Sequence, residues 1–533
     1  MEGRYDPVVP NRTLWLLLGL AVLAAGPTRP VRAGNEQLAV SVVDEKTRQP
    51  IPCRMHLLGP NNQRPRRPDT ATPYWADHFV FPGDITLKLP LGEYTFELER
   101  GPEYHNREGH FTINRSADDT KQVDLGRFVD MSAEGWWSGD LLVRRPQKDA
   151  QLLMAADDLH VAQVVTWWNQ KSDWKGSDPA DHRCATVPGG ARPRTPLAHF
   201  DKNRWYHVLA GGYDQAGTEV LCFNLPAPAL RPGGPVEDPP LVEHLVQLRR
   251  QYPDLWVDLA SPLGWDLPLL VAHGQVQSIQ VLNRHFCRAS VLTDPEGGKP
   301  PDRKLYPGPT GYARWGQDIY FNLLECGLRI PPTAGSGSGM TPNPVGYNRV
   351  YVHLDGQFDY RQWWENLRRG QVVATNGPLL RPTVEGQLPG HVFQAEPGKK
   401  LELEIALTLS TRDPVSYLDI IQDGRVRHSL RFDEYAKAGR LPKLEFQHSG
   451  WFLLRVVTDV PQTYRFAITG PWYVEFGGQR RVSKQAARFF LDWVYQRARQ
   501  IVLDDPLRQS AVLAWHRKAR DFWQGLLARA NAE

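Results

Sequence analysis

The segment HVAQVVTWWN, residues 160–169, decides the fold of the central part of the chain. Its apolar run Val161–Trp167 predicts a short buried strand. On either side of this run, further short strands alternate with helical stretches. The strands are predicted at His207–Ala210, Val220–Phe223, Trp256–Leu259 and Ser278–Leu282, and the helices at Lys148–Asp157, Leu241–Tyr252 and Phe358–Arg369. Because strand and helix take turns, we predict a parallel sheet or β/α barrel over residues 130–380, with its site on the loops after the strands.

Two β-rich regions flank the predicted barrel, which makes the chain a multidomain α/β plus β protein. From 36 to 128, apolar and polar residues alternate, as at Leu38, Val40 and Val42, and this predicts a β-sandwich. The alternation returns from 381 to 480 and predicts a second sandwich. Residues 483–533 should form two helices, capped by Ser483 and by Asp505 before Pro506. The predicted buried faces are Ala486, Phe490, Trp493, Val494 and Ile501 on the first helix and Leu507, Ala511, Trp515, Ala519, Phe522 and Leu526 on the second.

Residues 1–33 have the organisation of a secretory signal peptide. Arg4 and Arg12 precede the apolar run Leu14–Ala25, and Val31-Arg32-Ala33 supplies small residues at the cleavage positions. The apolar run is too short to span about 30 Å of hydrocarbon, although an uncleaved interfacial or membrane anchor is the alternative. We therefore expect a secreted or periplasmic protein that starts near Gly34 and has no stable membrane span after cleavage.

The composition argues against two classes of protein, nucleic-acid binders and disulfide-rich scaffolds. The 533 residues include 63 Lys+Arg and 59 Asp+Glu, a net charge of +4, which argues against a nucleic-acid partner. This length suggests about three domains at roughly 100–200 residues each. The five cysteines are too sparse for a disulfide scaffold and contain no CxxC pair, and their odd number leaves at least one of them free. The sequence leaves the oligomeric state open.

Several motifs, in a fixed order, give the central region a family resemblance. The stretch Gly135-Trp136-Trp137-Ser138-Gly139-Asp140-Leu141 resembles the opening strand of the PHP-type metallohydrolases, in the branch called the CehA/McbA family. The further matching stretches are Val164–Asn169, Val208–Gly212, the block around His285, Gly335–Gly339, Gly346–Val352 and Thr375–Pro378. The leading region is similar to the carboxypeptidase-regulatory-like sandwich that precedes the barrel in many members. The resemblance covers most of the chain after residue 33.

The resemblance implies a distorted β/α barrel that binds divalent metals, such as zinc, manganese or iron, and hydrolyses phosphate, ester or carbamate bonds. Most of the implied ligands are missing, however. The family's Asp-Leu-His-x-His reads Asp140–Arg144, its Thr-Asp-His-Asn reads Thr166–Asn169, and its Gly-Ser-Asp-x-His reads Gly335–Gly339. The expected glutamate falls at Gly212, with Asp214 and Glu219 nearby. Only Asp140 and His285 remain as remnants of a metal site, and a catalytic zinc typically needs three protein ligands.

The sequence therefore predicts a barrel without metal chemistry. Its mouth would be lined by Asp140, Arg144, Arg145, Trp167, Trp168, Asn169 and His285. Arginine forks bind carboxylate or phosphate, and indole faces accept sugars or cations, so one interpretation is a site for a small anionic or sugar-like ligand. The other interpretation is that Trp167 and Trp168 plug the mouth. The alternative from another class is an active hydrolase that holds a divalent metal with an unconventional ligand set.

Overall fold

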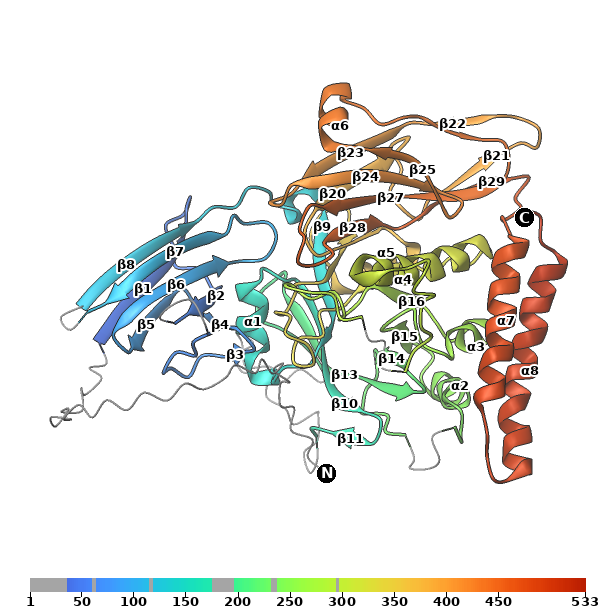
Figure 1. Ribbon diagram of the computed structural model, residues 1–533, viewed down its shortest axis with the longest axis horizontal. Coiled ribbons are helices and arrows are strands. Elements are labelled where there is room, and N and C mark those ends of the chain that lie inside the picture. The colour runs from blue at the N-terminus through green and yellow to red at the C-terminus, as the bar shows by residue number, and fades with distance from the viewer. Residues whose placement is uncertain (1–35, 60–63, 115–117, 175–195, 232–236, 294–296) are drawn as a thin grey trace, which may run out of the picture.

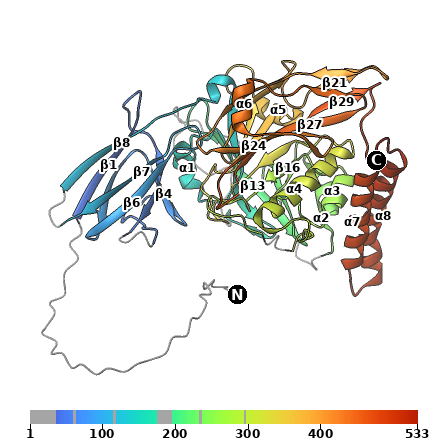
Figure 2. The ribbon, with the colours of Figure 1, turned by 45° about the horizontal axis from the view of Figure 1, so that its top comes forward.

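The computed structural model describes residues 36–533 apart from 60–63, 115–117, 175–195, 232–236 and 294–296. The predicted signal peptide and Cys184 lie outside the described residues. The protein is multidomain and rich in sheet, with a few helices. An N-terminal β-sandwich lies on one side of a central barrel, a second sandwich lies over the barrel, and two long helices lie on the far side (Figures 1 and 2). None of the described helices is both long enough and apolar enough to cross a membrane.

The N-terminal sandwich is built from two sheets, one with the order β5-β1-β8 and one with the order β3-β4-β2-β6-β7. Its strands are β1 (Glu36–Asp44), β2 (Cys53–Leu58), β3 (Tyr74–Trp75), β4 (His78–Phe81), β5 (Asp84–Leu89), β6 (Gly92–Glu99), β7 (Arg107–Ile113) and β8 (Asp118–Leu125). As the alternation predicts, Cys53, Met55 and Leu57 of β2 face the core between the sheets. Arg54 and His56 consequently lie on the opposite face of the same strand.

The central barrel combines parallel and antiparallel strands. β9 pairs with β10 and β10 with β13 in parallel, β13, β14 and β15 are antiparallel, and β15, β16 and β17 are again parallel. The loop after β17 closes the barrel against β9, because Gly337 N donates to Leu142 O at 2.9 Å and Arg144 N donates to Ser338 O at 2.8 Å. The strands are β9 (Trp136–Val143), β10 (Val161–Trp168), β11 (Lys171–Ser172), β12 (Leu197–His199), β13 (Trp205–Gln215), β14 (Thr218–Phe223), β15 (Trp256–Leu259), β16 (Ser278–Leu282), β17 (Pro332–Ala334), β18 (Arg349–His353) and β19 (Val372–Thr375).

The helices of the central region are α1 (Ala150–Ala156), α2 (Leu241–Gln251), α3 (Leu267–Ala272), α4 (Gly308–Glu325) and α5 (Tyr360–Arg369). Two short 3-10 helices, Ser132–Glu134 and Gln147–Asp149, precede α1. Helices α1, α2 and α5 are predicted from the sequence, whereas α4, which begins at Gly308, is not. The start of α4 has no side-chain cap and carries Pro at its first turn, so its sequence resembles that of a loop.

The C-terminal sandwich is not separated from the barrel by a break in the sheet. β19 pairs with β18 on one side and with β28 on the other, and β28 then pairs with β27. The ladder therefore runs across residue 380, where the sequence analysis places a domain boundary. The elements of this region are β20 (Leu379–Val384), β21 (Val392–Ala395), β22 (Leu401–Leu403), β23 (Ile405–Ser410), β24 (Val415–Gln422), β25 (Arg425–Leu430), α6 (Phe432–Ala438), β26 (Leu444–Phe446), β27 (Gly450–Thr458), β28 (Phe466–Thr469) and β29 (Trp472–Phe476).

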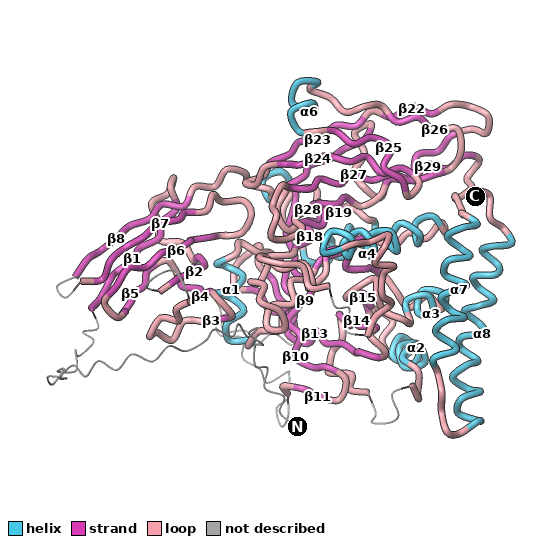
Figure 3. Tube along the Cα trace, in the orientation of Figure 1, coloured by secondary structure: helices cyan, strands magenta, loops and turns pink. Residues whose placement is uncertain are grey.

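Two long helices, α7 (Lys484–Gln500) and α8 (Pro506–Ala528), end the chain on the side of the barrel away from the N-terminal sandwich, where they pack against α3 and α4 (Figure 3). The predicted caps are confirmed, since Ser483 accepts from Ala486 N and Asp505 accepts from Leu507 N and Arg508 N. The predicted face of α8 is confirmed at Ala519 and Leu526, but Leu507 is wrong and Ala511, Trp515 and Phe522 are each one residue before the buried position. Leu507 is 82% exposed, and the buried residues are Val512, His516, Ala519, Trp523 and Leu526.

Buried ion pairs fix the N-terminal sandwich to the barrel. Asp157 and Asp158 follow α1 and are each only 2% exposed. Arg54 of β2 donates to Asp157 Oδ2 at 2.6 Å, and Arg100 donates to Asp158 Oδ1 at 3.3 Å. Arg127 also pairs with Asp158. Separating such a buried pair would leave two charges without partners away from water, which is costly. These contacts therefore hold the sandwich in one orientation against the barrel.

Candidate functional site

The candidate site is the mouth of the barrel, where the strands β9, β10, β13, β16 and β17 end and their loops meet. Asp140 lies on β9 and is completely buried. Its Oδ1 accepts hydrogen bonds from Leu142 N and Ser336 N, both at 3.0 Å, and its Oδ2 accepts one from Gly346 N at 2.8 Å. Burial raises the pKa of this carboxyl to about 6, against the three N–H groups that lower it. Asp140 therefore joins three segments of backbone, and both of its oxygens are occupied.

A second carboxylate at the mouth is held by an arginine. Glu219 stands near the start of β14, and Arg284 follows the end of β16. Arg284 Nε donates to Glu219 Oε2 at 3.1 Å and its Nη2 donates to Oε1 at 2.9 Å. The two side chains are 7% and 13% exposed, so the pair is largely removed from water. A guanidinium bound by two parallel hydrogen bonds thus supplies the positive charge beside Glu219.

His285, the remaining imidazole of the predicted remnant site, is bound to a helix. Its Nδ1 hydrogen-bonds the hydroxyl of Tyr312 on α4, and the residue is 4% exposed. Burial and then the charge of Arg284 lower the pKa of His285 to about 3. The ring is therefore neutral at pH 7, and one of its nitrogens is occupied by Tyr312.

Two positions that carry ligands in the family have no room for a side chain. Gly337 and Gly339 both adopt positive φ, +64° and +93°. A Cβ on Gly337 would lie 2.5 Å from the Cβ of Arg284, and a Cβ on Gly339 would lie 1.8 Å from Arg144 O. Aspartate and histidine are therefore excluded at these positions unless the backbone moves.

The two tryptophans of β10 lie over glycines of the neighbouring strand, β13, where a larger residue would not fit. Trp167 lies opposite Gly211 and Trp168 opposite Gly212 in the β10–β13 ladder. A Cβ on Gly211 would lie 2.0 Å from the Trp167 indole. Trp167 is 2% exposed, donates from Nε1 to Leu209 O at 2.9 Å and packs edge-on against Tyr213. Trp167 is thus part of the barrel core, whereas Trp168 is half-buried at the rim.

The other predicted site residues point in different directions. Arg144 is exposed, with its guanidinium 5.9 Å from the centre of the Trp168 ring. Arg145 is buried against the N-terminal sandwich, 5.3 Å from the Trp75 ring centre, with Nη2 donating to Tyr74 O at 3.3 Å. Asn169 adopts a positive φ of 51° and accepts from Asp214 N at 3.0 Å, which shapes the turn after β10.

Of the seven predicted site residues, the structure brings Arg144 and Trp168 into contact. The described side-chain contacts of the other five are to residues outside that set. A cavity of about 1260 Å³ lies elsewhere, between α4, the β24–β25 turn and α7. It is lined by polar groups that include Glu325, Asp423, Arg427, His448 and Arg481.

The sequence analysis missed two groupings. It names Glu219 only as a neighbour of Gly212 and gives Arg284 no role, although Arg284 precedes His285 directly. It also missed His56, Asp77 and His78 in the N-terminal sandwich, which the structure gathers into a group able to hold a metal ion. The available signal was the Asp77-His78 dipeptide, together with His56 among the alternating residues of β2.

No family model and no curated protein match the chain. Among solved structures, the chain is similar to a fibronectin(III)-like module of Clostridium thermocellum CbhA, at 14% sequence identity. That match covers 18% of this chain and 98% of the module, with a TM-score of 0.13. A score this low carries no argument about fold or function, so the interpretation of the site rests on its geometry.

Proposed function

We propose that this chain is an exported, non-catalytic relative of the CehA/McbA-type PHP hydrolases, whose barrel serves as a scaffold and binds a small anionic or sugar-like molecule at its rim. The observation that carries the loss of catalysis is the state of the donors at the mouth. Asp140 accepts three backbone hydrogen bonds, Glu219 is held by Arg284, and His285 is bound to Tyr312. A catalytic metal needs about three donors converging on one point, and these three have protein partners instead.

The exposed Arg144 on the face of Trp168 supports the binding part of the proposal. A guanidinium presents a planar fork of donors to a carboxylate or phosphate, and the indole presents a flat apolar face to a sugar ring. Because Arg144 has water on its outer side, a ligand would reach both groups without opening the core.

Catalysis is tested with the untagged chain from residue 34, assayed on phosphoester, carbamate and ester substrates with added zinc, manganese or iron. We expect turnover no higher than that of the His285→Ala variant. Turnover that chelation abolishes, and that falls in both His285→Ala and Glu219→Gln, would instead establish a hydrolase with an unconventional ligand set.

Binding is tested by calorimetry with a panel of small carboxylates, phosphates and sugars. We expect at least one class to bind saturably and to lose binding in Arg144→Ala and in Trp168→Phe. Arg361→Ala is the matched control, since Arg361 is an exposed arginine on α5 with a side chain 89% accessible. Failure of every panel member to bind, or equal binding by Arg144→Ala, would leave the barrel as a scaffold alone.

A further inference from the structure

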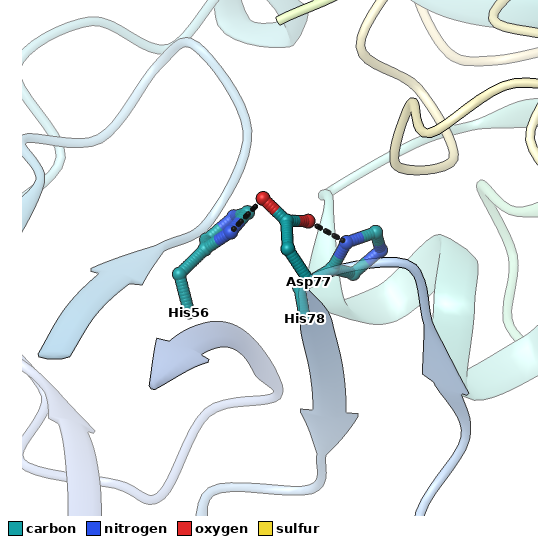
Figure 4. Close-up of side chains that lie close together, drawn as sticks. All are labelled: His56, Asp77 and His78. Atoms are coloured by element: carbon teal, nitrogen blue, oxygen red, sulfur yellow. Dashed lines mark hydrogen bonds and ion pairs between the residues drawn. The ribbon is translucent and has the colours of Figure 1, made fainter. Parts of the chain in front are cut away.

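A cluster of three potential metal ligands lies outside the barrel, on the outer face of the N-terminal sandwich. His56 of β2 lies directly opposite His78 of β4 in an antiparallel ladder, and their ring centres are 5.3 Å apart. Asp77 immediately precedes β4, in the turn of the β3–β4 hairpin. Figure 4 shows the carboxylate of Asp77 lying between the two imidazoles. The register of one ladder therefore brings two nitrogens and an oxygen donor together.

The distances within this cluster suit a small cation. His56 Nδ1 lies 3.3 Å from Asp77 Oδ2, and His78 Nδ1 lies 3.0 Å from Asp77 Oδ1. One donor atom from each of the three residues lies within 4.8 Å of the others. Zinc binds imidazole nitrogen and carboxylate oxygen at about 2.0–2.2 Å, so modest rotations of these side chains bring all three donors to one ion.

The Nδ1 atom of His56 is buried and has no hydrogen-bond partner within the described residues. His56 as a whole is 7% exposed and His78 is 2% exposed. Buried polar atoms are normally hydrogen-bonded. The contact of this nitrogen with Asp77 Oδ2 at 3.3 Å is an ion pair that lacks full hydrogen-bond geometry, so a metal ion would satisfy the nitrogen better than the carboxylate alone does. On its other side, His56 Nε2 accepts a hydrogen bond from Arg54 Nε at 3.3 Å and lies 3.7 Å from Glu99 Oε2, so these two side chains fix the orientation of the ring.

The charges around the cluster leave room for a cation. Arg54 and Arg288 are paired with Glu97, Glu99 and Asp157. In the described part of the chain, by contrast, Asp77 pairs only with the two histidines and with no arginine or lysine. The carboxylate of Asp77 thus lacks a permanent positive partner within the described residues.

We propose that His56, Asp77 and His78 form a binding site for a divalent transition-metal ion, with zinc as the first candidate. Two imidazoles and one carboxylate match the donors preferred by zinc, iron and copper rather than by calcium or magnesium. The side chain of Asp77 is 44% exposed, so the ion keeps at least one position open to water. The site lies in the sandwich and is independent of the donors at the barrel mouth.

A bound ion would also fasten the sandwich to the barrel. The β3–β4 hairpin that carries Asp77 and His78 touches the loop after β17, where Trp75 Nε1 donates to Thr341 O at 2.8 Å. Arg145 from the barrel covers the Trp75 ring. Because the ion would join this hairpin to β2, it restricts the part of the sandwich that contacts the barrel.

The proposal is tested by titrating zinc into untagged, chelator-stripped protein and measuring binding by calorimetry and melting temperature by circular dichroism. We expect one zinc ion per chain and a higher melting temperature. Asp77→Asn keeps the side chain's size, and both it and His78→Ala should weaken binding by at least about 100-fold, since loss of outer-shell partners alone costs about 10–100-fold.

His110→Ala is the matched control, because His110 is an exposed histidine on β7 of the same sandwich, and it should bind zinc as the wild type does. Asp77→Asn guards against a folding artefact: its melting temperature without metal should stay near that of the wild type. Absence of saturable zinc binding, or unchanged affinity in Asp77→Asn, would overturn the proposal. A hydrolase centre in the barrel would instead lose its metal in His285→Ala and keep it in Asp77→Asn.

Discussion

The barrel mouth and the outer face of the N-terminal sandwich contain similar donors that differ in how fully their partners satisfy them. At the mouth, Asp140, Glu219 and His285 each have protein partners that meet hydrogen-bond geometry. In the sandwich, two histidines share one carboxylate, and a buried nitrogen of His56 has no hydrogen bond among the described residues. The comparison teaches that the presence of imidazole and carboxyl groups does not decide metal binding. What decides it is whether the fold has already supplied them with partners.

The largest difference between the two regions should appear when one carboxylate is removed from each. Asp140→Ala leaves three buried N–H groups without an acceptor, at about 1–3 kcal/mol each, so we expect the free energy of unfolding to fall by about 3–9 kcal/mol. Asp77→Ala should cost only about 1 kcal/mol without metal, because the side chain is half-exposed. Urea denaturation measures both, and equal losses would contradict the distinction.

The Arg284–Glu219 pair gives the next largest effect. Glu219→Gln removes one charge of a buried pair and should lower the free energy of unfolding by about 3–5 kcal/mol, because Arg284 is left uncompensated. The double variant Glu219→Gln/Arg284→Met should recover much of this loss, since it leaves no buried charge without a partner. Denaturation of the two variants side by side is the measurement. A double variant as unstable as the single one would show that the pair is not an electrostatic substitute for a cation.

The close packing of Trp167 against Gly211 tests whether the barrel mouth is filled by side chains. Gly211→Ala places a Cβ 2.0 Å from the indole and should cost about 1–3 kcal/mol, the usual penalty of overpacking. Gly525→Ala on α8 is the control, because its Cβ would meet nothing within 4 Å. That change should stabilise the protein by about 0.5–1 kcal/mol, as helix propensity favours alanine. Thermal melts distinguish the two outcomes, and a neutral Gly211→Ala would show that the mouth is not filled.

The smallest expected effect is the pH dependence of zinc affinity. Burial lowers the pKa of His56, but the carboxylates of Asp77 and Glu99 outweigh it, even against the charge of Arg288, and the pKa is raised. A metal must displace the proton, so zinc affinity should fall by about tenfold per pH unit below that pKa. His78 adds nothing in this range, since its pKa is about 3.

Calorimetry between about pH 5.5 and 8, the range in which histidine usually titrates, measures this slope. His56→Gln should bind more weakly and show a flatter profile. A pH-independent affinity in the wild type would mean that His56 is not a ligand.

Much of the fold could be predicted because its signals are local. Alternation placed β2, and the capping residues Ser483 and Asp505 placed the starts of α7 and α8. The face of α8 could not be predicted as well, because aromatic residues lie on both sides of the helix and its partners come from distant segments. Trp523, for example, donates to Pro268 O, 255 residues away in sequence.

The site was predicted largely from the metal ligands that the sequence lacks. The missing ligand types at 337 and 339 could be seen in the sequence, but the close approach of Arg144 and Arg284 to these glycines could not. The Arg284–Glu219 pair spans 65 positions, and the pairing of His56 with His78 depends on the register of a ladder. Such contacts depend on the order and register of the strands, which cannot be read from a single sequence.

The ladder from β18 through β19 to β28 limits where recombination can divide the gene without disrupting the fold. A recombination break near residue 380 would strip β19 of one edge partner and expose its backbone donors and acceptors, a surface prone to aggregation. The described ladders of the N-terminal sandwich stay within its own two sheets, and its attachment to the barrel includes buried charges. Gene shuffling could therefore exchange the first module if its arginines travelled with it, whereas the remainder must be transmitted whole.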